Sequence, residues 1–478
     1  MAVMSNVFHN LKDITGLTYD QVKFVVTVFL CLPLSYIFRT CCSTKTISPA
    51  TRHYLSLICG AGLLTFCFGR QAVHLLLSSV MSYILMLCID EAVVHRYVFV
   101  CAMTYLSVIH INRMLTQNGY VIDISGPLML ATIKITYVGF NIHDAFMLKR
   151  EDENKPTKPT LLEYLSYIFG FTTVFCGPPP EFQDYKAFIE ETQYIKFTQQ
   201  KKIPSPVLPA LAKSVLGYAM VACYAILVPY YEPHFLGNKE RLANSSLLSN
   251  ILFAEMVIYL NKAKYFSPFL IGEGVGNMAG LGFNGYDKNG NPLWNKLQNM
   301  NPFGLEIARN IKEKVECWNI VTNRWLKKCI YNRTRHMPLL MTWFFSAFWH
   351  GFYPGYYMFF VPVGVGLFVA RKMRRKVRPY FLHSPARKIF YDVVTLLCTR
   401  MIVSFYAAAF TMMDARATLR FWRGAYYYGH VILVVGLVLI FILPDAEVLE
   451  GKQNGVLHMP NGSSLHDKNG FTKTSHEE

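Results

Sequence analysis

Apolar runs long enough to cross a bilayer recur along this chain, separated by short polar stretches. They lie near Val22–Phe38, Tyr54–Phe68, Ala72–Ile89, Val94–Ile109, Leu128–Met147, Leu161–Cys176, Leu211–Tyr230, Leu247–Leu260, Pro338–Trp349, Tyr356–Ala370, Ile389–Met412 and Tyr427–Leu443. Because a spanning helix needs about 20 residues, the runs predict about ten to twelve membrane segments. We therefore predict an all-α fold, a polytopic transmembrane helical bundle.

Several of these runs are short or contain Gly and Pro. The clearest case ends in Phe175-Cys176-Gly177-Pro178-Pro179-Pro180. Broken or re-entrant segments are tolerated in a membrane only where protein or a water-filled cavity covers the backbone. The interruptions therefore predict a bundle that encloses an internal chamber.

Polar stretches punctuate the bundle. Residues 149–159 form a charged loop that contains Pro, and the spacing of apolar residues predicts an amphipathic helix over Glu181–Lys202. The longest stretch without a convincing span is Gly272–Tyr331. Its last part, Leu305–Tyr331, has helical periodicity and predicts one long helix that lies on or dips into the membrane.

Two domains follow from this pattern. We expect residues 1–444 to form the transmembrane unit, and residues 445–478 are polar and rich in Gly, Asn, Ser and His, which predicts a disordered tail. The first apolar run has no small-residue cleavage site, so we expect it to remain as a span.

Composition supports the membrane class. Of the 478 residues, 53% are hydrophobic, and the 15% that are aromatic suit membrane interfaces and the walls of lipid tunnels. The net charge of +17 falls mainly beside apolar runs, as in Arg371–Arg378. This placement is typical of positive-inside anchoring and of contact with anionic membrane lipids. No nucleic-acid recognition motif accompanies the charge, so nucleic acid is not an expected partner.

The 12 Cys lie mostly inside apolar runs, and the sequence contains no CxxC pair. This pattern supports neither a zinc site nor a redox motif, and we expect free thiols that act as small buried hydrophobes.

His350 is the most informative polar residue, because it ends the apolar run Pro338–Trp349. An ionisable group within a membrane run is a functional hypothesis by default. The alternative is a neutral His bonded to a backbone carbonyl at a helix end, and the residues alone leave both open. Gly351, Pro354 and Gly355 follow, which predicts a helix break beside a cavity.

Asn319 lies in a polar segment, one helical turn before Asn323, while Trp318 and Trp325 share another face. Spacing alone favours an interfacial helix with Trp anchors and solvated Asn side chains over a catalytic role.

At these two segments the chain resembles the membrane-bound O-acyltransferase (MBOAT) family, which carries an Asn in a polar segment and a His in a following apolar one. The resemblance is greatest to its lysophospholipid acyltransferase branch, especially the members that act on lysophosphatidylethanolamine and lysophosphatidylserine. It rests on Gly177-Pro178, Phe182-Gln183-Asp184-Tyr185, Gly280-Leu281-Gly282-Phe283-Asn284-Gly285-Tyr286-Asp287, Trp318-Asn319, Trp325-Leu326 and Ser346-Ala347-Phe348-Trp349-His350-Gly351-Phe352-Tyr353-Pro354-Gly355-Tyr356-Tyr357. It extends from about Phe24 to Pro444 and is strongest from Gly280 to Tyr357.

The resemblance implies that His350 and Asn319 are catalytic and that acyl-CoA is a co-substrate, with no bound cofactor and no metal. It implies acyl transfer, with an unsaturated chain favoured, to lysophosphatidylethanolamine, lysophosphatidylserine or lysophosphatidylcholine in phospholipid remodelling. The location it implies is the endoplasmic reticulum membrane. Candidate substrate-binding residues that line an acyl tunnel are Trp318, Trp325, Trp343 and Trp349, although helix packing is the alternative for each.

In the reaction that this predicts, a neutral imidazole at His350 removes the proton from the acceptor hydroxyl, which then attacks the thioester. The resemblance gives Asn319 the second role. Its amide either donates to the developing oxyanion or holds the acceptor hydroxyl in line, and the sequence leaves this choice open.

Rival motifs are weaker. Gly280–Gly285 fits G-x-G-x-x-G, but no strand-then-helix unit surrounds it. Asp287–Pro292 begins like a calcium loop but has Pro where Gly is required. The functional alternatives are a protein or peptide O-acyltransferase of the same family and, in a different class, a lipid transporter or scramblase. The last would also need intramembrane polar groups, but no internal repeat is visible.

Overall fold

The computed structural model describes residues 2–116, 122–148, 158–195 and 204–444, and within these residues the regular structure is helical. The N-terminal helices are α1 (Ala2–Thr15), α2 (Tyr19–Cys41), α3 (Pro49–Phe68), α4 (Val73–Cys88), α5 (Val94–Thr116), α6 (Ser125–Leu148), α7 (Leu161–Phe169) and α8 (Phe182–Ile189). The rest are α10 (Val207–Leu227), α11 (Lys239–Ala243), α12 (Leu247–Ala279), α13 (Pro302–Ile307), α14 (Ile311–Cys317), α15 (Ile320–Cys329), α16 (Pro338–His350), α17 (Pro354–Val377), α18 (Pro385–Met412), α19 (Ala415–Gly424) and α20 (Tyr428–Ile442).

The predicted all-α transmembrane class is confirmed. Five helical segments within the described residues are long and apolar enough to cross a membrane, or six if the bent pair α19 and α20 forms one span. They comprise α2, the run from α3 through α4, α5, α10 with the turns that follow it, and α18. Other predicted apolar runs form shorter helices or helices interrupted by polar residues.

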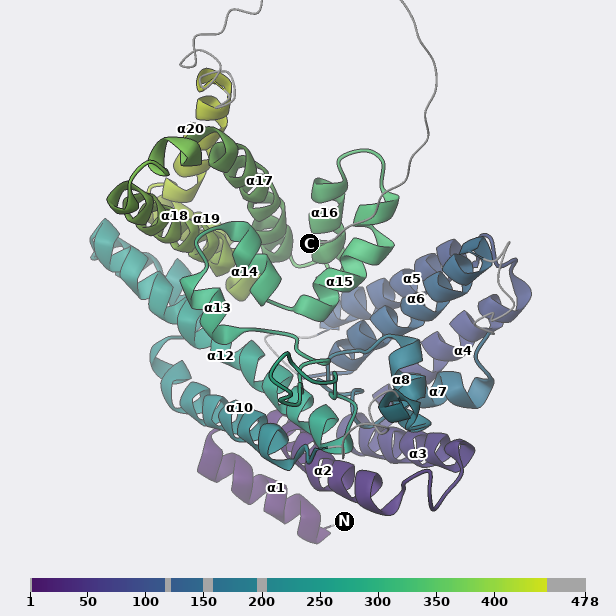
Figure 1. The fold of residues 1–478 in the computed structure, drawn as a ribbon. Helices are drawn as coiled ribbons and strands as arrows, with labels where there is room; N and C mark the ends of the chain where they lie inside the picture. The colour runs from purple at the N-terminus through teal and green to yellow at the C-terminus, as the bar shows by residue number, and fades with distance from the viewer. Residues whose placement is uncertain (1, 117–121, 149–157, 196–203, 445–478) are drawn as a thin grey trace, which may run out of the picture.

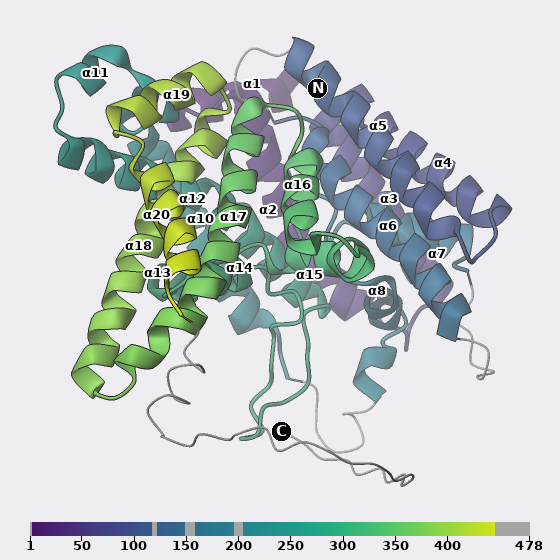
Figure 2. The ribbon, with the colours of Figure 1, turned by 90° about the horizontal axis from the view of Figure 1, so that it is seen from above.

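The two larger hydrophobic clusters among the described residues are built mainly on α2 to α8 and on α12 with α17 to α20. Helix α16 contacts both clusters. Phe345, Phe348 and Trp349 pack against the first, while Leu339 and Trp343 pack against the second. Figures 1 and 2 show α16 standing between α17 on one side and α5 with α6 on the other. Helix α16 therefore lies between the two hydrophobic clusters.

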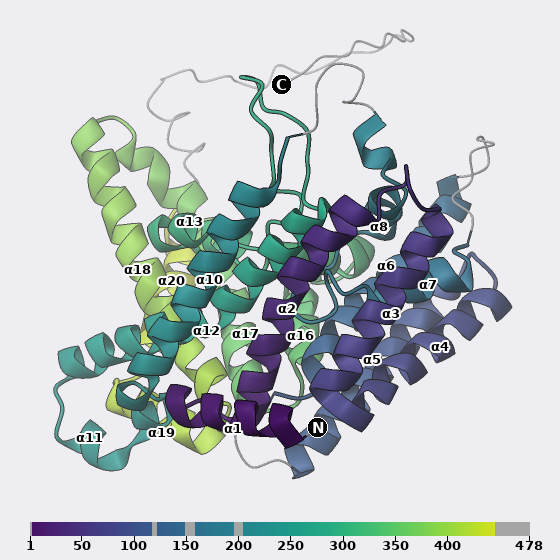
Figure 3. The same cartoon turned by 90° about the horizontal axis from the view of Figure 1, so that it is seen from below.

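Helix α12 is longer than the apolar run that predicted it, because it continues past Leu260 to Ala279. It lies beside α2 and α10 (Figure 3). Polar residues on this extension find partners within the protein. Glu273 pairs with Lys213 of α10, and Asn277 Nδ2 donates to the backbone oxygen of Trp294 at 3.3 Å. Such paired groups lower mean hydropathy without preventing burial.

The sixth apolar run, Leu161–Cys176, is interrupted as predicted. Helix α7 ends at Phe169, and the buried chain that follows is irregular as far as Pro180. The ammonium group of Lys134 in α6, which is fully buried, donates to the backbone oxygens of Tyr167 and Ile168 at 3.0 and 3.1 Å, and to Thr173 Oγ1 at 2.8 Å. One cation thereby satisfies the open carbonyl end of α7.

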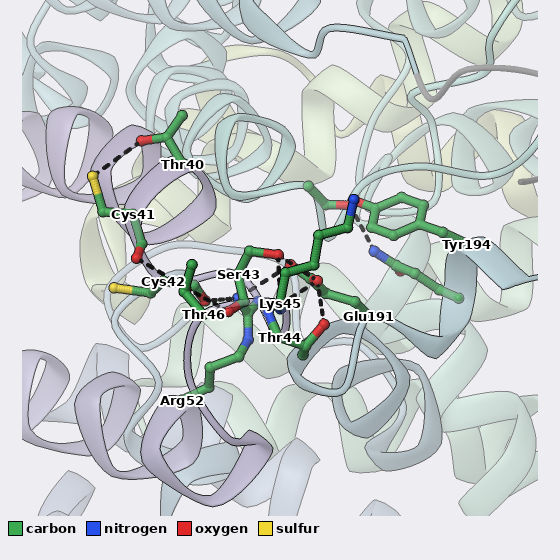
Figure 4. A network of polar contacts seen from close by, with 12 residues as sticks. Thr40, Cys41, Cys42, Ser43, Thr44, Lys45, Thr46, Arg52, Glu191 and Tyr194 are labelled. Carbon is green, nitrogen blue, oxygen red and sulfur yellow. Dashed lines mark hydrogen bonds and ion pairs between the residues drawn. The ribbon is translucent and has the colours of Figure 1, made fainter.

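The predicted amphipathic helix over Glu181–Lys202 is shorter than expected. Helix α8 ends at Ile189, and Glu191 takes the left-handed conformation with φ of 57°; residues 196–203 lie outside the described residues. The Glu191 carboxylate accepts from Ser43 Oγ at 2.9 Å and Thr44 Oγ1 at 2.6 Å, and lies 3.2 Å from the Arg52 guanidinium (Figure 4). This network turns the chain back and ties it to the loop between α2 and α3.

The prediction of one long helix over Leu305–Tyr331 is wrong. The segment forms α13, α14 and α15, separated by two breaks. Asn310 starts α14 by accepting from the backbone N–H of Glu313 at 3.0 Å. The second break is at Asn319, whose φ of 47° interrupts the helical path. Both breaks are local side-chain and backbone effects that a periodic pattern does not reveal.

Two predictions concern residues that the structure leaves undescribed. The disordered tail, residues 445–478, lies outside the described residues, as does most of the charged loop of residues 149–159. The division into a catalytic unit of residues 1–444 and a tail stays a prediction.

Gly60 marks a close approach between α3 and the end of α7, because a Cβ there would lie 1.7 Å from the backbone oxygen of Phe169. Gly62 in the same helix has no heavy atom within 4 Å of such a Cβ. We expect Gly60→Ala to destabilise the fold by roughly 1–3 kcal/mol through overpacking. Gly62→Ala should be neutral or stabilising by up to about 1 kcal/mol, because Ala is the better helix former.

The measurement is the apparent melting temperature of each variant purified in the same detergent. Equal melting temperatures for the two variants would show that this helix contact is not as close as described.

Candidate active site

His350 is the last residue of α16, and the backbone after it explains why the helix ends there. Gly351 has φ of 120°, a conformation that favours glycine. Pro354 then opens α17, and a Cβ on Gly355 would lie 2.2 Å from the backbone oxygen of Ala409. The predicted helix break is confirmed, and it sets the imidazole at the end of a helix rather than along its side.

Aromatic rings surround His350. Its ring lies 5.1 Å from Phe360 in a stacked arrangement, 5.2 Å from Phe410 edge-on and 5.7 Å from Tyr356, measured between ring centroids. Trp349 lies edge-on at 4.8 Å. Such a wall of rings solvates an imidazolium poorly, so it favours the uncharged imidazole.

The His350 side chain is partly exposed and forms no hydrogen bond with any residue that the structure describes. The backbone-bonded histidine that the sequence left open as an alternative is instead His110 of α5. Its Nε2 lies 3.1 Å from the backbone oxygen of Trp349, and its ring would meet a Cβ on Gly351 at 3.2 Å. His110 therefore fastens the end of α16, while the His350 nitrogens remain available.

Asn319 precedes the first residue of α15 and takes the left-handed conformation, which Asn tolerates better than most residues. Its side chain does not cap its own helix. Instead Oδ1 accepts from Asn299 Nδ2 at 3.2 Å and from Thr322 Oγ1 at 2.8 Å. With the carbonyl oxygen occupied twice, the amide N–H groups are the end of this side chain that can meet a substrate.

Aromatic contacts connect the two predicted catalytic segments. Trp318 lies 6.2 Å from Tyr265 of α12, Tyr265 lies 6.0 Å from Phe410, and Phe410 contacts His350, all between ring centroids. On the other side of α15, Trp325 lies 5.8 Å from Trp349. A series of ring contacts thus links His350 to Trp318, the residue before Asn319, although Asn319 and His350 are 31 positions apart in the sequence.

The four predicted substrate-binding Trp residues occupy different surroundings. Trp325 is fully buried and donates from Nε1 to Thr136 Oγ1 at 2.9 Å, and Trp349 is 4% exposed and donates to the backbone oxygen of Met129 at 3.2 Å. Trp343 packs against α17 near Gly364. Trp318 is partly exposed and borders the aromatic chain beside Asn319. Helix packing occupies the first three, and an acyl-binding role stays a prediction for all four.

The two rival motifs have structural explanations. Gly280 ends α12 with φ of 100°, so the Gly-rich sequence follows a helix rather than a strand. Asp287 accepts from the backbone N–H groups of Asn289 and Asn291, both at 2.8 Å, and hydrogen bonds from Asn291 lower the pKa of its carboxyl group. The loop that resembles a calcium site is therefore a self-bonded turn in which the carboxylate already has its partners.

Sequence reasoning missed His110, Asn299 and Phe410. His110 directly follows the apolar run Val94–Ile109, so an ionisable residue at a span end was an available signal. Asn299 lies in the loop before α13 and Phe410 in α18, and nothing local in the sequence connects either to the site. Their roles depend on tertiary packing.

Comparison with known proteins places the chain. The model of the "MBOAT, membrane-bound O-acyltransferase family" matches residues 86–412, more than half of the chain. The chain is 35% identical to mouse "Membrane-bound glycerophospholipid O-acyltransferase 1", over 92% of this chain and 93% of that protein. It is 32% identical to human "Membrane-bound glycerophospholipid O-acyltransferase 2", over 92% and 88%, and 32% identical to Drosophila melanogaster "Lysophospholipid acyltransferase 6", over 92% and 63%.

Proposed function

This chain belongs to the membrane-bound O-acyltransferase family, and we propose that it transfers a fatty acyl chain from acyl-CoA to the free glycerol hydroxyl of a lysophospholipid. The family resemblance seen in the sequence is thereby confirmed, and the protein is a multi-pass membrane acyltransferase. The names of these relatives specify glycerophospholipids and lysophospholipids, which supports a lysophospholipid acceptor and a role in phospholipid remodelling.

One observation carries the proposal: two segments linked by ring contacts each keep a group that this reaction needs, an imidazole and an amide, without a competing hydrogen bond to a described residue. The His350 imidazole makes no hydrogen bond with a described residue, so a ring nitrogen can accept a proton. The Asn319 amide has its oxygen occupied, so it presents N–H groups. A proton acceptor and a neutral hydrogen-bond donor are the minimum set for attack of an alcohol on a thioester.

In the proposed reaction, His350 takes the proton from the acceptor hydroxyl as its oxygen bonds to the thioester carbonyl carbon. Asn319 donates to the carbonyl oxygen, which gains negative charge in the tetrahedral intermediate. The bond to sulfur then breaks, and the proton held by His350 passes to the departing thiolate. The products are a phospholipid and free coenzyme A, and neither an acyl-enzyme intermediate nor a metal takes part.

The free amide end favours one of the two roles that the sequence left open for Asn319. An amide that positioned the acceptor hydroxyl by accepting its proton would need a free Oδ1, but that atom already accepts from Asn299 and Thr322. Donation to the oxyanion uses the N–H groups that remain. We therefore assign Asn319 to oxyanion stabilisation.

The finer assignments follow from the family branch. We propose lysophosphatidylethanolamine and lysophosphatidylserine as preferred acceptors, an unsaturated acyl-CoA as donor, and the endoplasmic reticulum membrane as location. The assay is lipid mass spectrometry on purified enzyme with a panel of lysophospholipids and acyl-CoAs. We expect one diacyl phospholipid and one free thiol per turnover. Acyl label recovered in polypeptide, or lipid movement across vesicles without acylation, would contradict the proposal.

For His350, the informative change is His350→Gln, which keeps a neutral polar side chain but cannot take up the proton. We expect kcat to fall by ~10²–10⁴, the usual contribution of a general base. His383→Gln is the control, since His383 is exposed before α18. Activity of the His350 variant within about tenfold of the unmodified enzyme would exclude its role as base.

For Asn319, the decisive change is Asn319→Asp. A carboxylate keeps both accepted hydrogen bonds and tolerates the left-handed backbone, but it loses every N–H donor. We expect kcat to fall by ~10²–10³ with normal expression. Asn319→Gly, which suits the backbone and removes the side chain, should be similarly impaired. Near-normal activity of the Asp variant would mean that Asn319 serves only as an acceptor.

A further inference from the structure

The orientation of the Asn319 amide depends on a second buried amide, that of Asn299. This residue lies in the loop between α12 and α13 and is 2% exposed. It makes three contacts with the start of α15: its backbone oxygen accepts from the N–H of Ile320 at 2.7 Å, its Oδ1 accepts from the N–H of Val321 at 3.0 Å, and its Nδ2 donates to Asn319 Oδ1 at 3.2 Å.

Asn299 can face only one way. The backbone N–H of Val321 is always a donor, so the atom of Asn299 that meets it must be the oxygen. Nδ2 of Asn299 then faces Asn319, and the atom that meets it must be an acceptor. Reversing the Asn319 amide would set two N–H groups against each other. The fixed backbone donor of Val321 thereby determines which end of Asn319 remains free.

Thr322 cannot make this choice by itself. Its hydroxyl lies 2.8 Å from Asn319 Oδ1, but a hydroxyl donates or accepts with equal ease. With Thr322 alone, both orientations of the Asn319 amide would be satisfied. Asn299 is therefore the asymmetric partner.

The position of Asn299 is set by Glu273 of α12. The backbone N–H of Asn299 donates to Glu273 Oε1 at 2.8 Å, and Glu273, only 1% exposed, pairs with Lys213 of α10. A buried carboxylate is tolerated because the ion pair and the backbone hydrogen bond compensate its charge. The chain of contacts thus extends from α10 and α12 through the loop to the start of α15.

We propose that Asn299 is a positioning residue that presents the Asn319 amide N–H groups to the reacting carbonyl, and that Glu273 holds Asn299 in place. This inference rests on the proposed acyl transfer and deepens it, because it explains how an amide of nearly symmetrical shape acts only as a donor. Neither residue touches the substrate.

The test compares Asn299→Asp with Asn299→Ala. The Asp variant keeps an oxygen for the Val321 N–H but presents its second oxygen to Asn319, which attracts the amide N–H groups and turns the carbonyl toward the substrate. The Ala variant leaves the amide free to adopt either orientation. We expect kcat to fall by ~10² or more in the Asp variant and only several-fold in the Ala variant, with KM little changed in both.

A purely structural role predicts the opposite order, because Asp still caps α15 and Ala does not. Asn10→Asp, an identical change at an exposed position of α1, is the matched control and should keep full activity. A kcat for the Asp variant equal to or above that of the Ala variant would overturn the proposal.

A double-mutant cycle separates positioning from a charge or folding effect. In the Asn319→Gly background no amide remains to be oriented, so adding Asn299→Asp should lower kcat no further. A further loss comparable to that in the single variant would overturn the proposal. Full activity of Asn319→Gly itself would instead refute the catalytic role of Asn319, so the two failures are distinguishable.

Glu273→Gln is made in parallel as a variant that leaves the Asn299 side chain intact. Loss of the ion pair with Lys213 should loosen the loop that carries Asn299. We expect kcat to fall several-fold with KM unchanged. In the Asn319→Gly background the same change should not lower kcat further. An unchanged kcat would show that Glu273 does not hold Asn299 for catalysis. The melting temperature of each purified variant, measured in the same detergent, shows that the compared proteins are folded.

Discussion

Buried backbone that leaves its helix must find a hydrogen-bond partner, and this requirement shapes the ends of α7 and α16 and the start of α15. In an apolar interior no water is at hand to satisfy an open carbonyl or N–H group. Lys134 meets the carbonyls at the end of α7, and Asn299 meets the N–H groups at the start of α15. His110 meets the backbone at the end of α16. In each case a side chain from a distant helix or loop completes a helix terminus.

The same requirement builds the candidate site. His350 and Asn319 both lie at helix ends, where the backbone changes direction and where side chains from other elements converge. Each is positioned by a partner that hydrogen-bonds the neighbouring backbone. His110 bonds the carbonyl oxygen of the residue before His350, and Asn299 accepts from the N–H groups just after Asn319. Because α16 packs against both hydrophobic clusters, its end is fixed relative to both of them. The His350 imidazole and the N–H groups of the Asn319 amide thereby have no hydrogen-bond partner among the described residues, while the backbone around them is hydrogen-bonded.

The sequence was sufficient for the class of fold and for the residues of the proposed chemistry. Long apolar runs indicated the spans, and the motifs around Asn319 and His350 indicated the family that the comparison confirmed. Helix boundaries were less predictable. The segment from Leu305 to Tyr331 keeps helical periodicity across two breaks, because Asn310 and Asn319 interrupt the backbone through local hydrogen bonding and a positive φ, which do not alter the apolar pattern. Helix α12 was underestimated because Glu273 and Asn277 count as polar until their buried partners are known.

Partners such as Asn299 and His110 were beyond the sequence for a further reason. What matters about an asparagine in a site of this kind is the direction of its amide, and packing hardly senses that direction, since the oxygen and the NH₂ group have nearly the same size. Only hydrogen bonds distinguish the two ends of the amide. In a series of hydrogen-bonded amides and hydroxyls, every donor and acceptor can exchange roles together. The direction of such a hydrogen-bond series is fixed where it reaches a group that can only donate. Here that group is the backbone N–H of Val321 at the start of α15. The beginning of a helix, which always presents donors, can thus determine the hydrogen-bonding role of a side chain two amides away.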